Sequence, residues 1–294
     1  MEKLFGYVMM LALSIGGFVE QSDAKVAELL RQASAALGGE SALARVHSLT
    51  ATGTVRRAAG DAQLAGDLTL HLQLPDRMLR IDSLSPDGGL TLVSEQGVNG
   101  DTLLRSTRTF NAPPGAVIRT PPPPPRGSDA ETQAVRAARA DLARLVVALL
   151  LRAPESQPLD FSDGGQAESP DGTADVVDVK GRDGNAFAAK LFLDASSHRP
   201  LMLSYRGVAP RMVIQTQRLQ RGATPPDARQ DPPPSLPSGD VVDIDLFLDD
   251  YRPVNGLLLP HHITRSVGGD VTEEWTFTAM QINPTFKSGT FDPH

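Results

Sequence analysis

The sequence predicts an α+β protein in which one curved antiparallel sheet packs against helices. Apolar and polar residues alternate in many short segments joined by tight turns, which is typical of antiparallel strands. Two longer segments, near residues 25–37 and 129–153, instead repeat apolar residues at helical spacing. The strands follow one another without a helix after each, so the pattern does not favour a doubly wound nucleotide-binding fold.

Composition excludes several classes of site. The 294-residue chain has a formal net charge of −7 and contains no cysteine. An acidic chain does not favour nucleic acid, because the phosphate backbone calls for a basic face. Without cysteine there is no disulfide, thiolate metal site, catalytic thiol or lipid-modified cysteine of a bacterial lipoprotein.

Residues 1–24 have the layout of a secretory signal peptide. Lys3 gives a short charged start, residues 4–19 are almost wholly apolar, and Ser22 and Ala24 fit the −3 and −1 positions of a cleavage site. The apolar run is short for a membrane span, which needs about 20 residues. Because Glu2 nearly cancels the charge of Lys3, an uncleaved anchor is the alternative. We expect cleavage, a periplasmic or secreted location, and a single domain over residues 25–294.

Three helices are predicted after this segment. The first carries one apolar stripe and ends at Gly38-Gly39, where glycine tolerates a left-handed backbone. A short second helix covers residues 41–46. The third runs from about residue 129 to 153, begins at a capping box formed by Ser128 and Glu131, and stops at Pro154. The stripe of the first helix consists of Val26, Leu29, Leu30, Ala33 and Leu37.

Strands are predicted before and after the third helix. Residues 48–107 contain four or five, including a hairpin at Asn99-Gly100, and residues 174–207 and 240–291 contain the others. Proline-rich loops are expected near residues 112–127 and 221–239. Residues 121–125 are five consecutive prolines, which favour an extended segment that is either a stiff surface loop or a docking motif.

The hairpin at residues 256–277 is the strongest candidate for a metal site, because it contains His261, His262, Glu273 and Glu274. Successive strand residues point to opposite faces, so the two histidines cannot grip one ion together. Only His261 and Glu273 share a face, and zinc needs three or four ligands. We therefore interpret the hairpin as scaffold, with Val271, Trp275 and Phe277 in one apolar row and Glu273 near water at the turn.

Other catalytic motifs are lacking from the sequence. It contains no Gly-x-Ser-x-Gly elbow, no phosphate-binding glycine loop and no HExxH pattern. A hydrolase hypothesis would rest on scattered His, Asp and Ser residues. We expect a protein that is not an enzyme, with no catalytic residues, no metal and no cofactor.

Three stretches together resemble a known superfamily. They are "AALGGESALARVHSLTATGTV", "LPDRMLRIDSL" and the terminal stretch that begins "DDYRPVNGLLLP" and ends "FKSGTFDPH". Together they resemble periplasmic proteins of the outer-membrane lipoprotein-sorting type, the LolA/LolB-like superfamily. The resemblance implies a curved, open antiparallel sheet, an incomplete barrel, wrapped around helices. It also implies an arginine on an early strand that holds the closed form of the carrier proteins. In this sequence Arg56 and Arg57 both fit that position, and the role is assigned to neither.

The resemblance implies an apolar cavity, and hence a non-catalytic periplasmic binding protein. Its expected partner is a lipid, a lipoprotein acyl chain or another apolar ligand, and a monomer is expected. The alternative is an envelope protein-interaction or sensor module of the same fold. The apolar rows that face inward give the candidate cavity residues: Leu68, Leu70, Leu72, Leu145, Leu149, Leu191, Leu193, Leu257, Leu259, Trp275 and Phe277. A filled core is the other interpretation of the same rows.

Overall fold

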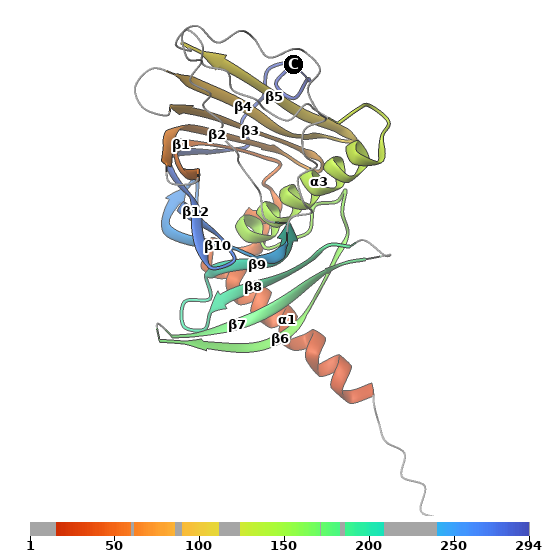
Figure 1. Cartoon of the computed structure of the whole chain (residues 1–294). Helices are drawn as coiled ribbons and strands as arrows, with labels where there is room; N and C mark the ends of the chain where they lie inside the picture. The colour runs from red at the N-terminus through yellow and green to blue at the C-terminus, as the bar shows by residue number, and fades with distance from the viewer. Residues whose placement is uncertain are drawn as a thin grey trace, which may run out of the picture.

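A computed structural model describes residues 16–59, 62–85, 90–111, 124–170, 172–182, 186–208 and 240–293. Its twelve strands form one antiparallel sheet in the order β5-β4-β3-β2-β1-β12-β11-β10-β9-β8-β7-β6. The sheet does not close, because β5 and β6 lie at its two ends and are separated in space (Figure 1). The predicted fold class, an open curved sheet wrapped around helices, is confirmed.

The sheet is built from hairpins between consecutive strands, with one exception. Strand β1 pairs with β12, which brings the first and the last strand together in the middle of the sheet. The predicted turn at Asn99-Gly100 joins β4 to β5, and Gly100 has the positive φ of 59° that such a turn requires. The strands are β1 (Ser48–Ala59), β2 (Ala62–Gln73), β3 (Arg77–Ser85), β4 (Thr91–Asn99), β5 (Thr102–Phe110), β6 (Leu159–Ser169), β7 (Gly172–Gly181), β8 (Ala188–Asp194), β9 (Pro200–Val208), β10 (Val241–Val254), β11 (Leu257–Val267) and β12 (Asp270–Ile282).

The helices are α1 (Gly16–Ala36), α2 (Glu40–Ala44) and α3 (Asp129–Leu150). The predicted stripe of α1 is confirmed, since Val26, Leu29, Ala33 and Leu37 are buried and Leu30 is partly buried. Helix α1 packs on β6, and just beyond its end the carbonyl of Leu37 accepts a hydrogen bond from the backbone N–H of Leu258 at 2.9 Å.

Helix α3 begins and ends where the sequence indicates, within a few residues. At its start, Ser128 accepts a hydrogen bond from the backbone N–H of Glu131, and the Glu131 carboxylate accepts one from the N–H of Gly127. This is the predicted capping box, with the difference that Glu131 accepts from the N–H of the residue before the N-cap. At its end, Leu151 takes a left-handed conformation with a φ of 55° and terminates the helix just before Pro154.

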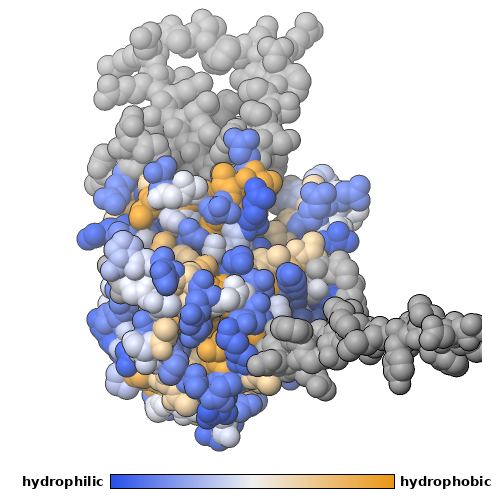
Figure 2. All heavy atoms as spheres, turned by 90° about the horizontal axis from the view of Figure 1, so that it is seen from below, coloured by the Kyte–Doolittle hydropathy of each residue, from blue (hydrophilic) through white to orange (hydrophobic). Residues whose placement is uncertain are grey.

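Most of the apolar core lies between the concave face of the sheet and the helices. Helix α3 crosses this concave side, between strands β3–β5 on one wall and β8–β9 on the other (Figure 1). Its second half is buried over the whole run from Leu145 to Leu151. The face seen from below is largely hydrophilic, with apolar residues in small patches (Figure 2). The large apolar side chains are therefore mainly internal.

Some predictions fall on residues that the structure does not describe. Residues 1–15 of the predicted signal peptide, residues 112–123 of the first proline-rich loop and the whole of 221–239 lie outside the described ranges. Helix α1 runs through the predicted cleavage site at residue 24. Within the described part of the chain, no helix combines the length and apolar character needed to cross a membrane.

Candidate functional site

The eleven candidate cavity residues lie together in the structure. They come from β2, α3, β8, β11 and β12, belong to one apolar cluster, and are each at most 6% exposed. Strand alternation explains this, because inward-facing residues recur at every second position. In this conformation the residues are packed against other core side chains. Their role in lining a ligand cavity stays a prediction.

Helix α3 is held against the sheet mainly by apolar contact. Two arginines add polar ties. Arg139 donates from Nε to the carbonyl of Gly100 at 3.1 Å and pairs with Asp101 at 3.0 Å. Arg152 donates from Nη2 to the carbonyl of Val46 at 2.5 Å. Because apolar packing is not directional, another apolar surface can replace the contacts between α3 and the sheet.

The concave face also carries a buried group of charges, which we call the ionic cluster: Arg57, Arg80, Asp82 and Glu273. Arg57 on β1 reaches Asp82 at 2.5 Å and Glu273 at 2.6 Å. Arg80 on β3 donates from Nε to Asp82 at 2.8 Å and from Nη2 to Glu273. The side chains of Asp82 and Glu273 are 0% and 4% exposed. The cluster thus ties β3, β1 and β12 together on the inner side of the curved sheet.

The electrostatics of the cluster favour its charged form. Burial alone would raise the pKa of Glu273, but the adjacent Arg80 and Arg57 outweigh it and lower that pKa to about 2. Burial alone would lower the pKa of Arg80, but Glu273 and Asp82 outweigh it and raise that pKa. The Glu273 carboxylate is therefore ionised at neutral pH.

Further polar and aromatic groups border the ionic cluster. Arg265 on β11 lies 4.0 Å from Glu273, and the guanidinium of Arg80 stacks over the Trp275 ring at 4.6 Å. On α3, the guanidinium of Arg144 stacks over Tyr205 at 3.7 Å. Burial and the nearby Asp141 raise the pKa of the Tyr205 phenol, against the opposing effect of Arg265 and Arg144. Tyr205 thus lies where β9, β11 and α3 meet.

The two histidines of the β11–β12 hairpin point as the alternation predicts. His261 is 5% exposed and its Nδ1 lies 3.0 Å from the carbonyl of Leu259, whereas His262 is only partly buried. Among the described residues, no group of three or more potential ligands is placed to hold a metal ion.

The environment predicted for β12 is wrong at two positions. Glu273 is 4% exposed and paired with arginines, and Val271 is 55% exposed. For Val271 the cause is a β-bulge: the register opposite Arg265 and Ser266 skips Thr272, so Val271 turns to the other face. Glu273 keeps the predicted face, but it is buried against its arginine partners and not near water. Trp275 and Phe277, which follow the bulge, face inward as predicted.

Sequence reasoning missed most of the ionic cluster. It left Arg56 and Arg57 as equivalent candidates and gave no role to Arg80, Asp82 or Arg265. One signal was available, because Arg80 and Asp82 occupy the same strand phase as the buried Met78 and Leu84. Charged residues on the buried face of a strand indicate either buried ion pairs or a polar binding site.

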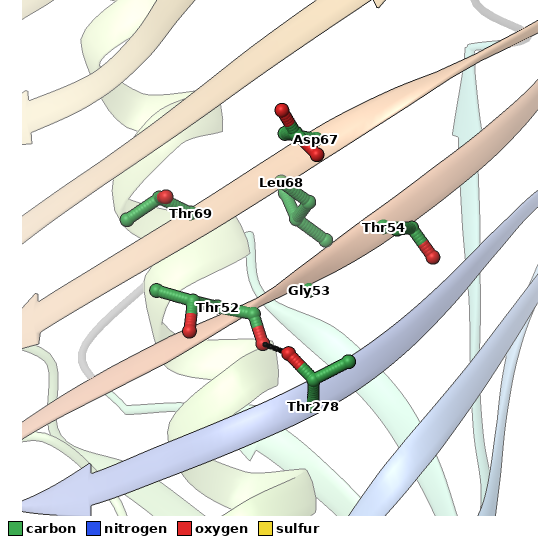
Figure 3. Close-up of a pocket in the computed structure, with 7 residues that line it drawn as sticks. All are labelled: Thr52, Gly53, Thr54, Asp67, Leu68, Thr69 and Thr278. Carbon is green, nitrogen blue, oxygen red and sulfur yellow. Dashed lines mark hydrogen bonds between the residues drawn. The ribbon is translucent and has the colours of Figure 1, made fainter.

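A recess on the other face of the sheet offers different chemistry (Figure 3). It has a volume of about 350 Å³ and lies where β12 bulges at Thr278, whose hydroxyl donates to the carbonyl of Thr52 at 3.2 Å. Threonines and an aspartate dominate its lining, so it suits an apolar ligand poorly. The lining residues are Thr52, Gly53, Thr54, Asp67, Leu68, Thr69 and Thr278.

The same convex face carries a small apolar cluster that the C-terminus covers. Leu79, Leu104 and Phe291 are each at most 5% exposed and form this C-terminal cluster, with Phe286 against it. The side chain of Asn99 donates to the carbonyl of Phe291 at 2.9 Å and fixes the covering segment. This apolar surface is therefore already occupied by the chain itself.

No protein-family model matches the sequence, and no curated protein matches it. Several solved structures are similar in shape. They include a LolA superfamily protein from Nitrosomonas europaea, 12% identical over 90% of this chain and 96% of that one, with a TM-score of 0.48. A domain described as an outer-membrane lipoprotein-sorting protein, from Vibrio parahaemolyticus, is 10% identical over 92% and 97%, with a TM-score of 0.43. A DUF1329 family protein from Desulfovibrio piger is 8% identical over 91% and 97%, with a TM-score of 0.44.

These similarities agree with the resemblance noted in the sequence, and they concern the fold. At identities of 8–12% and TM-scores below 0.5, they assign neither a ligand nor an activity to this chain.

Proposed function

We propose that this protein is a periplasmic or secreted binding protein for a lipid, an acyl chain or another apolar ligand, and that it acts without catalysis. The observation that carries the proposal is the placement of nine inward apolar residues from four strands around one separate helix, α3, which contributes Leu145 and Leu149 to the same apolar cluster. The ligand would lie between α3 and the concave face. The predicted signal peptide supports the location.

Uptake requires α3 to move, because the candidate residues are buried in the described conformation. The open sheet permits this movement, since its two edge strands, β5 and β6, do not pair with each other. Covering apolar surface contributes about 25 cal/mol per Å², so an acyl chain can replace the contacts that α3 gives up. The ligand would then act as a substitute for part of the core.

Two neighbouring leucines on opposite faces provide a matched test. Leu70 on β2 is 2% exposed and faces the concave core, whereas Leu79 on β3 is 5% exposed and faces the C-terminal cluster. Each is replaced by tryptophan, and the protein is purified from a membrane-containing host. Native mass spectrometry then measures the bound lipid, and organic extraction identifies it.

We expect wild type and Leu79→Trp to carry a discrete added mass of lipid size that denaturation removes. We expect Leu70→Trp to carry much less, because the larger ring fills ligand space. Overpacking costs each variant about 1–3 kcal/mol of stability, so the comparison is made between similarly destabilised proteins. Equal lipid loads in the two variants, or a wild-type protein that takes up no lipid even after incubation with it, would contradict the proposal.

A further inference from the structure

The charges around the ionic cluster do not balance. Three guanidinium groups, those of Arg57, Arg80 and Arg265, face two carboxylates, those of Asp82 and Glu273. One positive charge is left in excess. Buried charges are normally paired, because an uncompensated ion inside a protein is costly. This excess favours an additional anion at the concave face.

Arg265 is the arginine most able to receive such an anion. Its closest approach to Glu273 is 4.0 Å, which is too long for a hydrogen bond, and its side chain is 23% exposed. By comparison, Arg57 and Arg80 lie within 2.8 Å of a carboxylate and are 13% and 14% exposed. The nearby Arg144 does not change the balance, because it pairs with Asp141 on the same helix at 2.6 Å.

A buried donor lies beside these guanidinium groups. The indole N–H of Trp275 is buried and has no hydrogen-bond acceptor among the described residues, although Trp275 is only 6% exposed. Arg80 stacks on the same ring at 4.6 Å. A buried N–H without a partner destabilises the fold, so an acceptor at this position is expected. An oxyanion provides both the acceptor and the negative charge.

The site also lies next to the apolar rows. Strands β2 and β3 pair Leu68 with Asp82 and Leu70 with Arg80, and Trp275 follows Glu273 on the same face of β12. A molecule with its chain among the leucines would therefore carry its head group to the arginines. A purely apolar ligand would leave the charge and the indole N–H unmatched.

We propose that Arg57, Arg80, Arg265 and Trp275 form a binding site for the carboxylate or phosphate head of an amphiphilic ligand. This inference rests on the proposed function and narrows its ligand class, from any apolar molecule to an anionic amphiphile. Hydrogen bonds to Asp82 and Glu273 hold Arg57 and Arg80 in place, and Arg265 provides the charge that remains for the ligand.

The chain offers a direct optical probe, because Trp275 is its single tryptophan. Delipidated full-length mature protein is titrated with oleate, with oleyl alcohol and with inorganic phosphate, and Trp275 emission is followed. Oleate and oleyl alcohol share one chain and differ in the charge of the head group. Inorganic phosphate presents the anion without a chain.

Two arginine variants separate the effect of the proposed site from the effect of lowering the net charge of the protein. Arg265→Gln removes the guanidinium that lies farthest from a carboxylate; its hydrogen-bond partner is the uncharged phenol of Tyr205. Arg56→Gln is the matched control, because Arg56 is 67% exposed on the other face of β1 and lies 3.8 Å from its partner Glu274. Both variants remove one positive charge from the chain, and circular dichroism checks that each is folded.

We expect wild type and Arg56→Gln to bind oleate at least about tenfold more tightly than oleyl alcohol, as a charge-assisted contact implies. Arg265→Gln should lose most of that preference while still binding the alcohol. Equal affinity of wild type for the two lipids, or an unchanged preference in Arg265→Gln, would overturn the head-group site and leave the apolar-ligand function standing. If Arg265→Gln does not fold, the wild-type preference decides alone.

Two further outcomes are also decisive. If neither lipid binds, the proposed function itself fails, and the head-group site fails with it. If phosphate changes Trp275 emission at millimolar concentration while oleate binds no better than the alcohol, the site is for a free anion, and the amphiphile proposal is overturned.

Discussion

Two charge pairs on the same two strands have opposite environments. Arg56 and Arg57 are consecutive on β1, and their partners Glu274 and Glu273 are consecutive on β12. The inner pair, Arg57 with Glu273, lies at 2.6 Å with side chains 13% and 4% exposed. The outer pair, Arg56 with Glu274, lies at 3.8 Å with side chains 67% and 39% exposed. The same residue types are a solvated surface pair on one face and part of a buried network on the other.

The difference shows that the two faces of this sheet have different tasks. The convex face has exposed charges, a threonine-lined recess and an apolar cluster that the C-terminus covers. The concave face combines the large apolar core, a helix that is not part of the sheet, and buried ions beside an indole N–H. This contrast is the reason why we propose that the ligand binds on the concave face.

The largest expected difference between the inner and the outer pair is in stability, and it is measured by replacing one glutamate at a time. Glu273→Gln leaves Arg57 and Arg80 buried with one carboxylate fewer, and breaking a buried pair in this way costs about 3–5 kcal/mol. Glu274→Gln removes an exposed pair, which contributes at most about 1 kcal/mol. Urea denaturation at pH 7 measures both free energies of unfolding. Equal losses in the two variants would show that the inner network does not stabilise the fold.

Acid should produce the next largest effect, and it acts through the same residue. The pKa of Glu273 is lowered from 4.5 to about 2. Between these two pH values the carboxylate stays charged in the folded state, whereas it binds a proton in the unfolded state. The stabilisation is fully present above about pH 4.5 and is lost as the pH falls towards 2. This stabilisation amounts to about 3 kcal/mol, because each unit of difference between the folded and unfolded pKa contributes about 1.4 kcal/mol.

Unfolding of wild type and Glu273→Gln is compared between pH 7 and pH 3. We expect the gap between their free energies of unfolding to narrow as the pH falls, because the variant has no carboxylate to titrate at this position. Parallel curves over the whole range would contradict the low pKa of Glu273.

The sequence indicated the fold well because local patterns determine it. The stripe of α1, the capping box of α3 and the Asn99-Gly100 turn each depend on neighbouring residues, and the structure contains all three. The inward direction of the apolar rows also follows from strand alternation. The inference that the sheet is open, an incomplete barrel, came from the resemblance, since periodicity alone does not specify how strands are ordered.

The candidate site was predictable only in its apolar part. The ionic cluster joins Arg57, Arg80, Asp82 and Glu273. Within it, Arg57 and Glu273 form a hydrogen bond although they are 216 residues apart in the sequence. Their contact depends on β1 pairing with β12, which no local pattern shows. The bulge at Thr272 adds a second difficulty, because one extra residue reverses the face of Val271. Long-range pairing and bulges are therefore the features that sequence reasoning lacked.

The most direct test asks whether α3 must move for a ligand to enter. The chain has no cysteine, so Asp101→Cys with Arg139→Cys places the only two thiols where the β4–β5 turn and α3 are tied by an ion pair at 3.0 Å. A short, reducible thiol crosslinker joins them in the delipidated protein, and uptake of oleate is measured by native mass spectrometry before and after reduction. We predict that the crosslinked protein takes up little oleate and that reduction restores uptake to the level of the unlinked variant. Full uptake by the crosslinked protein would contradict a binding site between α3 and the concave face.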